Sequence, residues 1–130
     1  PWTKTFPGMN PHCKAFTVDT EEELAKKWAL IPPDVDILVT HSPPFGFMDE
    51  VDIVSEGHIV DYHTGSLSLY DLLDTEKIRP KLHLFGHIHE GYGVFFYRQD
   101  DIQPYDIYYV NASLVNERYE PVNKPIRVIL

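Results

Sequence analysis

Apolar residues at helical spacing mark the first regular element that the chain predicts. Leu24, Trp28 and Ile31 recur at i, i+4 and i+7, so they would share one face of a helix. A threonine and a glutamate three residues apart stand at its start, which is the spacing of a capping box, and acidic residues crowd the first turn. The pattern predicts a helix at about residues 20–30, ending before a proline pair.

Two short apolar runs are typical of buried strands. They are VDILVT at residues 35–40 and KLHLFG at residues 81–86. Between them, the sequence from residue 66 onwards carries leucines near helical spacing and predicts a helix that ends at Pro80. The connection of residues 42–65 is rich in proline, glycine and acidic residues. We expect a structureless loop there, and loops of this length usually serve a function.

The rest of the chain is expected to be mainly β-structure. Three further strands, forming a mostly antiparallel meander, are expected at residues 93–97, 106–112 and 125–130. Residues 1–18 show no clear period and are expected to be irregular, packed by their aromatic rings. The order of elements predicts an α/β fold in a single domain over residues 1–130, with a parallel β-α-β unit before the meander.

Composition and charge narrow the classes of function. The 130 residues are 43% hydrophobic and 24% charged, which is the balance of an ordinary soluble globular domain. The 20 acidic and 11 basic side chains give a formal net charge of −9, so long-range repulsion opposes binding to a nucleic-acid backbone. No run approaches the roughly 20 apolar residues of a membrane span. We therefore expect neither a nucleic acid nor a membrane as a partner.

Cysteine usage and the first residues bear on the compartment. The single cysteine, Cys13, excludes an intramolecular disulfide and a cysteine-rich zinc module, which fits a reducing compartment. The first residues show no charged-then-apolar signal segment. These features predict a cytoplasmic protein. The chain begins with proline rather than methionine, so we expect it to be a piece of a longer protein.

Three histidines follow the two predicted buried strands. A strand, a helix and a second strand in succession usually place the two strands parallel and adjacent, so their carboxyl ends meet at one edge. His41 follows the first strand directly, and His87 and His89 follow the second. Open α/β sheets place their ligands at this edge. Because imidazole binds zinc, iron and manganese, the sequence predicts a metal site built on these three residues.

A structural role for the histidines is the simpler alternative. A single histidine after a strand is usually a hydrogen-bonded boundary residue, and two histidines two positions apart are common by chance. Four other histidines have no motif partner, namely His12, His58, His63 and His83. Of these, His83 alternates with Phe85 along its strand, so it is expected to be packed or hydrogen-bonded rather than a ligand.

The segments that carry these histidines resemble a known family. DILVTHSPPFGFMD, RPKLHLFGHIHEGYG and YYVNAS together are similar to the second half of a calcineurin-like metallophosphoesterase, and most similar to its metallophosphoesterase-domain-containing branch. The resemblance runs from about Lys26 to Leu130. It implies a four-layer sandwich of two sheets flanked by helices. It also implies a site with two divalent ions, manganese, iron or zinc, that hydrolyses phosphomonoesters or phosphodiesters.

The resemblance also implies a role for each histidine. His41 and His87 match the two histidines that ligate one metal, and His89 matches the histidine that ligates its neighbour. The family's earlier motifs are missing, because no Asp-x-His, no Gly-Asp and no Gly-Asn-His precedes His41. We therefore expect the C-terminal part of a larger metallophosphoesterase domain, which binds its two metals incompletely unless another chain or segment complements it.

The predicted function is metal-dependent hydrolysis of a phosphodiester or nucleotide. One alternative is a non-catalytic metal- or nucleotide-binding fragment that acts through a partner. Another is a β-rich interaction module whose histidines are structural. The acidic stretch of residues 49–56 is expected to be a solvated loop, with a substrate lid as the functional alternative. Asn111-Ala112-Ser113 matches a glycosylation pattern formally, but in a cytoplasmic protein it is expected to end a strand.

Overall fold

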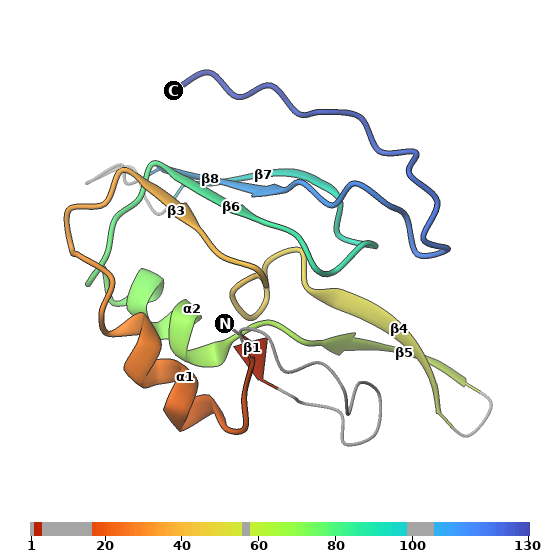
Figure 1. Cartoon of the computed structure of the whole chain (residues 1–130), viewed down its shortest axis with the longest axis horizontal. Coiled ribbons are helices and arrows are strands. Elements are labelled where there is room, and N and C mark those ends of the chain that lie inside the picture. The colour runs from red at the N-terminus through yellow and green to blue at the C-terminus, as the bar shows by residue number, and fades with distance from the viewer. Residues whose placement is uncertain (1, 4–16, 56–57, 99–105) are drawn as a thin grey trace.

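A four-stranded mixed sheet with two helices on one face forms the centre of the molecule (Figure 1). The computed structural model describes residues 2–3, 17–55, 58–98 and 106–130. Neither helix of this described part has the length and apolar character that a membrane crossing requires. The mixed sheet and the two helices confirm the α/β class, while the four-layer sandwich stays a prediction.

The sheet has the strand order β3-β6-β8-β7. Its strands are β3 (Ile37–Val39), β6 (Leu82–Phe85), β7 (Gly93–Arg98) and β8 (Asp106–Asn111). The first two are parallel neighbours, with Leu38 opposite His83, which confirms the parallel pair that the sequence predicts. Their carboxyl ends therefore lie at the same edge.

The expected meander after β6 is wrong in its order. Strand β8 pairs parallel with β6 and antiparallel with β7, so it lies between them. The reason is burial, because Ile107, Tyr109 and Val110 of β8 are almost inaccessible to solvent, whereas Val94 and Phe96 of β7 are about half exposed. The strand that is most thoroughly buried takes the inner position, and the more exposed strand takes the edge.

Each helix begins at a side-chain cap. Helix α1 (Glu21–Trp28) starts where the Thr20 hydroxyl accepts a hydrogen bond from the Glu23 N–H at 3.2 Å, as the capping-box spacing predicts. Helix α2 (Leu67–Asp74) starts in the same way at Ser66. The predicted continuation of α2 to Pro80 is wrong, because Glu76 has a φ of 55°, which a right-handed helix cannot contain.

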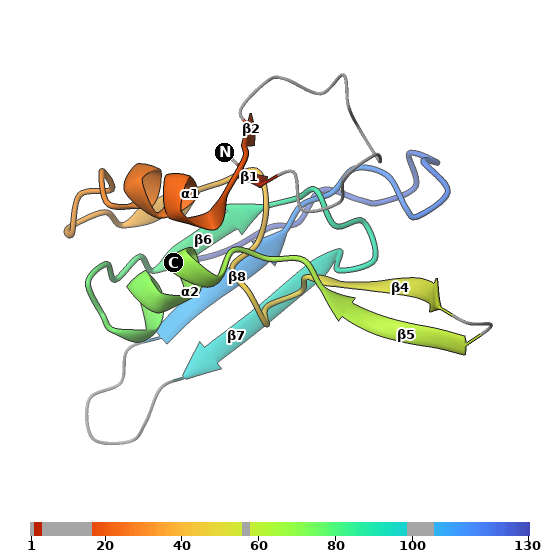
Figure 2. The same cartoon turned by 90° about the horizontal axis from the view of Figure 1, so that it is seen from below.

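The core lies between the sheet and the two helices, which lie in front of the sheet in Figure 2. Its buried side chains come from the two helices, from β3, β6 and β8, and from the connection after α2: Leu24, Trp28, Leu38, Leu69, Leu73, Ile78, Phe85, Ile107 and Tyr109. The Phe47 ring stacks on Tyr109 with centroids 4.4 Å apart, so the loop after β3 also covers the core. Packing of this kind fixes where that loop leaves the sheet.

Residues 42–65 are not a structureless loop. They contain β4 (Glu50–Ser55) and β5 (His58–His63), which pair antiparallel and project from the sheet as a separate ribbon (Figure 1). The glycine and acidic residues hid this hairpin in the sequence, although both strands are rich in β-branched residues. The long connection is therefore ordered by its own cross-strand hydrogen bonds.

The predicted strand at residues 125–130 is also wrong. The chain there has no regular structure and runs along the side of the sheet opposite the helices (Figure 1). Pro121 and Pro125 lack the N–H that a strand ladder needs, and Ile129 and Leu130 are exposed. Near the start, β1 (Trp2–Thr3) pairs parallel with β2 (Thr17–Val18). These two short strands contradict the expectation that residues 1–18 are wholly irregular. Residues 4–16, which include His12 and Cys13, lie outside the described part of the chain, and the expected ring packing stays a prediction.

Candidate functional site

His41 and His87 meet at the carboxyl edge of the two parallel strands. The ladder continues past β3, since the Thr40 N–H donates to the Leu84 carbonyl at 3.0 Å and the Gly86 N–H donates to the His41 carbonyl at 3.0 Å. The two imidazole centroids lie 4.6 Å apart, with the ring planes at 49°. The structure thus brings together two of the three histidines that the sequence selects, across 45 intervening residues.

The backbone at His87 is strained. Its φ is 68°, and the Ile88 N–H donates to the Gly86 carbonyl at 2.8 Å, so the three residues form a γ-turn of the rare positive-φ type. A non-glycine residue in the left-handed region costs on the order of 1–3 kcal/mol and persists only where its surroundings hold it. The chain therefore maintains an unfavourable turn at the residue that faces His41.

His89 takes a different direction. Its ring packs edge-on against Tyr119 of the C-terminal segment, with centroids 5.0 Å apart and an interplanar angle of 86°. Among the described residues, no group of three or more His, Cys, Asp or Glu side chains is arranged to hold a metal ion. The assignment of His41, His87 and His89 as a ligand set accordingly stays a prediction.

Burial keeps the two facing imidazoles uncharged at neutral pH. Burial, followed by the nearby His41 and His89, lowers the pKa of His87 to about 4. Desolvation also lowers the pKa of His41. A neutral imidazole has a lone pair to offer a metal, whereas imidazolium has none. The donor chemistry of this pair therefore fits a divalent ion, but two donors are only part of a complete set.

The buried Asn111 side chain holds the His87 turn through a hydrogen bond to Ile88, and the sequence had suggested no functional role for it. Asn111, at the end of β8, is fully buried and its Nδ2 donates to the Ile88 carbonyl at 2.6 Å. Its Oδ1 accepts from the Ser113 N–H at 3.1 Å and from the Ser113 hydroxyl at 2.7 Å. The NAS segment does end a strand, as predicted, and the signal that could have revealed more is its place at the end of the strand next to β6.

His63 has a partner that its sequence context did not reveal. Its Nδ1 lies 2.7 Å from Oδ1 of Asp49, a carboxylate with no exposed surface. The other oxygen of that carboxylate accepts the Gly65 N–H at 2.9 Å. In the sequence His63 has no motif partner, and its contact with Asp49 was not anticipated because the hairpin pairing that brings the two together was not predicted.

His83 is a packed and hydrogen-bonded residue, as predicted. It is completely buried, and burial lowers its pKa to about 3. Its Nε2 lies 2.8 Å from the Thr40 hydroxyl, which in turn donates to the Ser42 carbonyl at 2.7 Å. Because the threonine proton is committed to the carbonyl, Nε2 of His83 must be the donor in the first contact. His83 therefore belongs to the frame of the edge rather than to its ligands.

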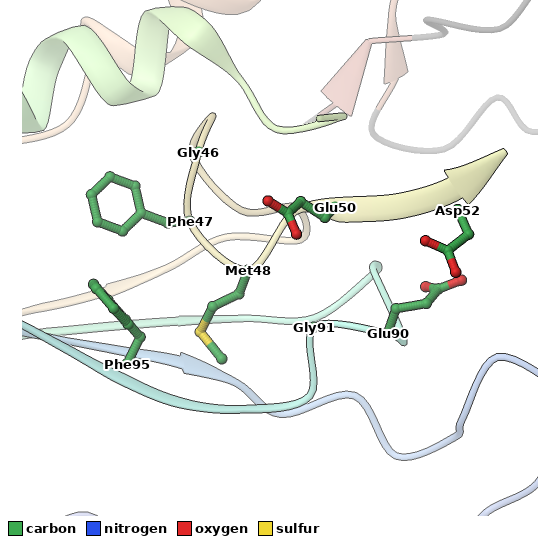
Figure 3. Close-up of a pocket in the computed structure, with 8 residues that line it drawn as sticks. All are labelled: Gly46, Phe47, Met48, Glu50, Asp52, Glu90, Gly91 and Phe95. Atoms are coloured by element: carbon green, nitrogen blue, oxygen red, sulfur yellow. The ribbon is translucent and has the colours of Figure 1, made fainter. Parts of the chain in front are cut away.

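An open pocket of about 340 Å³ lies between the hairpin and the chain after the His87 turn (Figure 3). Its lining residues are Gly46, Phe47, Met48, Glu50, Asp52, Glu90, Gly91 and Phe95. Figure 3 shows Asp52 and Glu90 at one end, with Phe47 and Phe95 at the other. The expectation that the acidic stretch of residues 49–56 is a solvated loop is wrong over Glu50–Ser55, which form β4, and two of its carboxylates form part of the pocket wall.

Comparison with known proteins identifies relatives of the chain. No family model matches it. Metallophosphoesterase domain-containing protein 1 of Homo sapiens is 39% identical over 130 residues, which is all of this chain and 34% of the relative. UPF0046 protein T07D4.2 of Caenorhabditis elegans is 35% identical over 114 residues, or 86% of this chain and 24% of the relative. The chain thus spans about one third or less of the length of these relatives, and it belongs to the metallophosphoesterase family that the human protein represents.

Proposed function

We propose that this chain contributes part of the active site of a metal-dependent phosphoesterase, one that hydrolyses phosphodiesters or nucleotides. The observation that carries the proposal is the pair of uncharged imidazoles, His41 and His87, 4.6 Å apart at the carboxyl edge of two parallel strands. This edge is where open α/β sheets bind their ligands. The names of the relatives support the same reaction class.

His41 and His87 would hold one divalent ion, and His89 would contribute to a neighbouring one. A bound divalent ion supplies charge stabilisation for phosphoryl oxygens and lowers the pKa of its water. The remaining ligands, carboxylates above all, would come from the part of the domain that lies beyond residues 1–130 or from a complementing chain. We propose manganese, iron or zinc as the ion and the cytoplasm as the compartment.

The chain's own residues have three tasks in this proposal. His41 and His87 stay neutral and so keep a lone pair for the ion. The hydrogen bond from His83 to Thr40 fixes the start of the loop after β3. The pocket beside the edge would receive one arm of the phosphoester, and the apolar end formed by Phe47 and Phe95 suits an organic group better than a second phosphate.

A non-catalytic metal-binding fragment is the second candidate. It is favoured by one observation, that the described residues assemble no group of three metal-binding side chains. A site with two imidazoles binds an ion more weakly than a closed site with four protein ligands. This candidate predicts measurable metal binding without turnover, both for the chain alone and after addition of the preceding part of the domain.

Hydrolysis of bis(p-nitrophenyl) phosphate with added Mn²⁺ tests the proposal. The chain is assayed alone and together with the preceding part of the longer protein. We expect turnover in the combined sample that falls at least 100-fold in His87→Ala and is kept in His58→Ala, a matched control on the exposed hairpin. Equal turnover in the two variants, or none in any sample, would refute the assignment of this edge as an active site.

A further inference from the structure

The Asn111 side chain joins the His87 turn to Ser113. Ser113 offers Asn111 an N–H, which can only donate, so the side-chain atom that faces it must be the oxygen. The amide nitrogen is thereby directed at the Ile88 carbonyl, 2.6 Å away. The orientation of this buried amide is thus fixed by its partners rather than chosen freely.

The bond to Ile88 bears directly on the strain at His87. The Ile88 N–H closes the γ-turn onto Gly86, and the Ile88 carbonyl on the other side of the same residue is held by Asn111. Fixing both polar groups of Ile88 leaves the preceding residue little freedom to relax from its φ of 68°. Ile88 is itself buried, so these groups have no water to replace the bonds.

We infer that Asn111, assisted by Ser113, is a positioning residue that holds His87 in its strained turn so that the imidazole faces His41. Its role at a metal rests on the proposed function, whereas its effect on the turn does not. Asn111 reaches the edge because β8 lies beside β6, with Asn111 opposite Phe85 at the ends of the two strands. Strand β8 thus carries Asn111, and the turn after the neighbouring strand β6 carries His87.

The first experiment compares Asn111→Asp with Leu73→Ala. The aspartate keeps the shape of the side chain but cannot donate to the Ile88 carbonyl, and Leu73→Ala lowers stability through the helical layer far from the edge. At pH 7 and well below each melting temperature, NMR detects the nuclear Overhauser effect between the His41 and His87 ring protons. Calorimetric titration with Zn²⁺ alone measures the affinity.

We expect Asn111→Asp to lose the contact between the rings and to weaken Zn²⁺ binding by about 10- to 100-fold, the usual effect of losing a group that orients a metal ligand. Leu73→Ala should keep both. The inference is overturned if Asn111→Asp keeps the ring contact and the affinity. If the wild-type chain alone binds no Zn²⁺, the ring contact decides the role of Asn111, and turnover of the combined sample separately decides the proposed function.

A double-mutant cycle covers the case in which Asn111→Asp does not fold. Ser113→Ala removes one of the two groups that orient the Asn111 amide, and His87→Gly removes the strain that the amide maintains. We expect the loss of melting temperature from Ser113→Ala to be larger in the His87→Gly background than in the wild type, because the wild-type turn can relax its strain when the amide is loosened and glycine has no strain to release. Equal losses in the two backgrounds would show that Asn111 and Ser113 only pack, and would overturn the inference.

Discussion

Strand β6 and the turn after it carry two histidines of opposite character, four residues apart. His83 lies inside the sheet in ordinary strand conformation, bonded to Thr40 and shielded from water. His87 is partly exposed, lies in a left-handed turn and faces a second imidazole. Burial lowers the pKa of both, so a lowered pKa does not separate them. His87 differs from His83 in its strained backbone and in its proximity to His41, and both features are typical of a functional position.

The largest expected effect is that of His83 on the pH dependence of the free energy of unfolding. Its folded pKa of about 3 lies below the unfolded value of 6.5, so the unfolded chain binds more protons between these values and stability falls as the pH is lowered through this window. Between pH 7 and pH 4, His83 alone should remove about 3 kcal/mol from the free energy of unfolding, at 1.36 kcal/mol per pKa unit.

Urea denaturation of the wild type and of His83→Leu across this range measures the effect. The variant should lose less stability on acidification than the wild type, because it has no group there to protonate. Parallel pH dependences of the two proteins would show that His83 is protonated without cost, and the contrast between the two histidines of β6 would then disappear.

The Asp49–His63 pair at the base of the hairpin sharpens the comparison with a third kind of histidine. Asp49→Ala removes the buried carboxylate that accepts the Gly65 N–H and contacts the partly exposed His63 ring. We expect a loss of about 2–3 kcal/mol in unfolding free energy, which is the cost of unsatisfied buried groups. Asp52→Ala is the matched control, since that side chain is exposed on β4, three residues further along the chain. Chemical denaturation at pH 7 should show little change for the control, and a similar loss in both would contradict the buried pair.

Backbone strain at His87 predicts that glycine is more stable than alanine at position 87 and less stable than alanine at position 89. Both His87→Gly and His87→Ala remove the imidazole, but only glycine adopts a φ of 68° without cost, so the glycine variant should be more stable by about 1 kcal/mol. At His89, whose φ is not positive, the order should reverse by about 0.4–1 kcal/mol because glycine raises the entropy of the unfolded chain. Thermal unfolding of the four variants reads this out, and the same order at both positions would exclude strain at His87.

The smallest effect is expected where His89 contacts the C-terminal segment. Tyr119 is 78% exposed, so Tyr119→Leu should change the unfolding free energy by about 0.5 kcal/mol or less. The His89 ring protons should nevertheless shift in the NMR spectrum, since the edge-on ring current is lost. His87 ring protons are the internal control. A shift of the His87 ring protons instead would show that Tyr119 contacts His87 and not His89.

Local pattern was enough to predict the parts of the fold that rest on local rules. The capped helix at α1, the parallel pair β3 and β6, and the meeting of His41 with His87 all follow from spacing, strand ends and crossover geometry. The packed state of His83 was predictable from its alternation with Phe85. Each of these needs only the chain's own neighbours in sequence or one well-established rule of connection.

What the sequence did not reveal depends on long-range pairing. The insertion of β8 between β6 and β7 is decided by which strand buries more apolar surface, and this is a property of the whole sheet. Asn111 and Ser113 become important only after that insertion, and Asp49 meets His63 only once the hairpin has formed. The direction of His89 is set by Tyr119, 30 residues further along the chain. These contacts have no signature at short range.

Gly91 gives the spacing between the hairpin and the edge a definite physical limit. A β-carbon at this position would lie 2.2 Å from the Met48 carbonyl oxygen and 3.0 Å from the amide nitrogen of Asn111. Only the hydrogen atom of Gly91 fits between its backbone and that of Met48, which precedes the hairpin, and the Asn111 amide lies close by. A side chain at this position would clash with the Met48 carbonyl and at the same time crowd the amide that holds the Ile88 carbonyl. A substitution of Gly91 would therefore disturb the pocket wall and the support of His87 together.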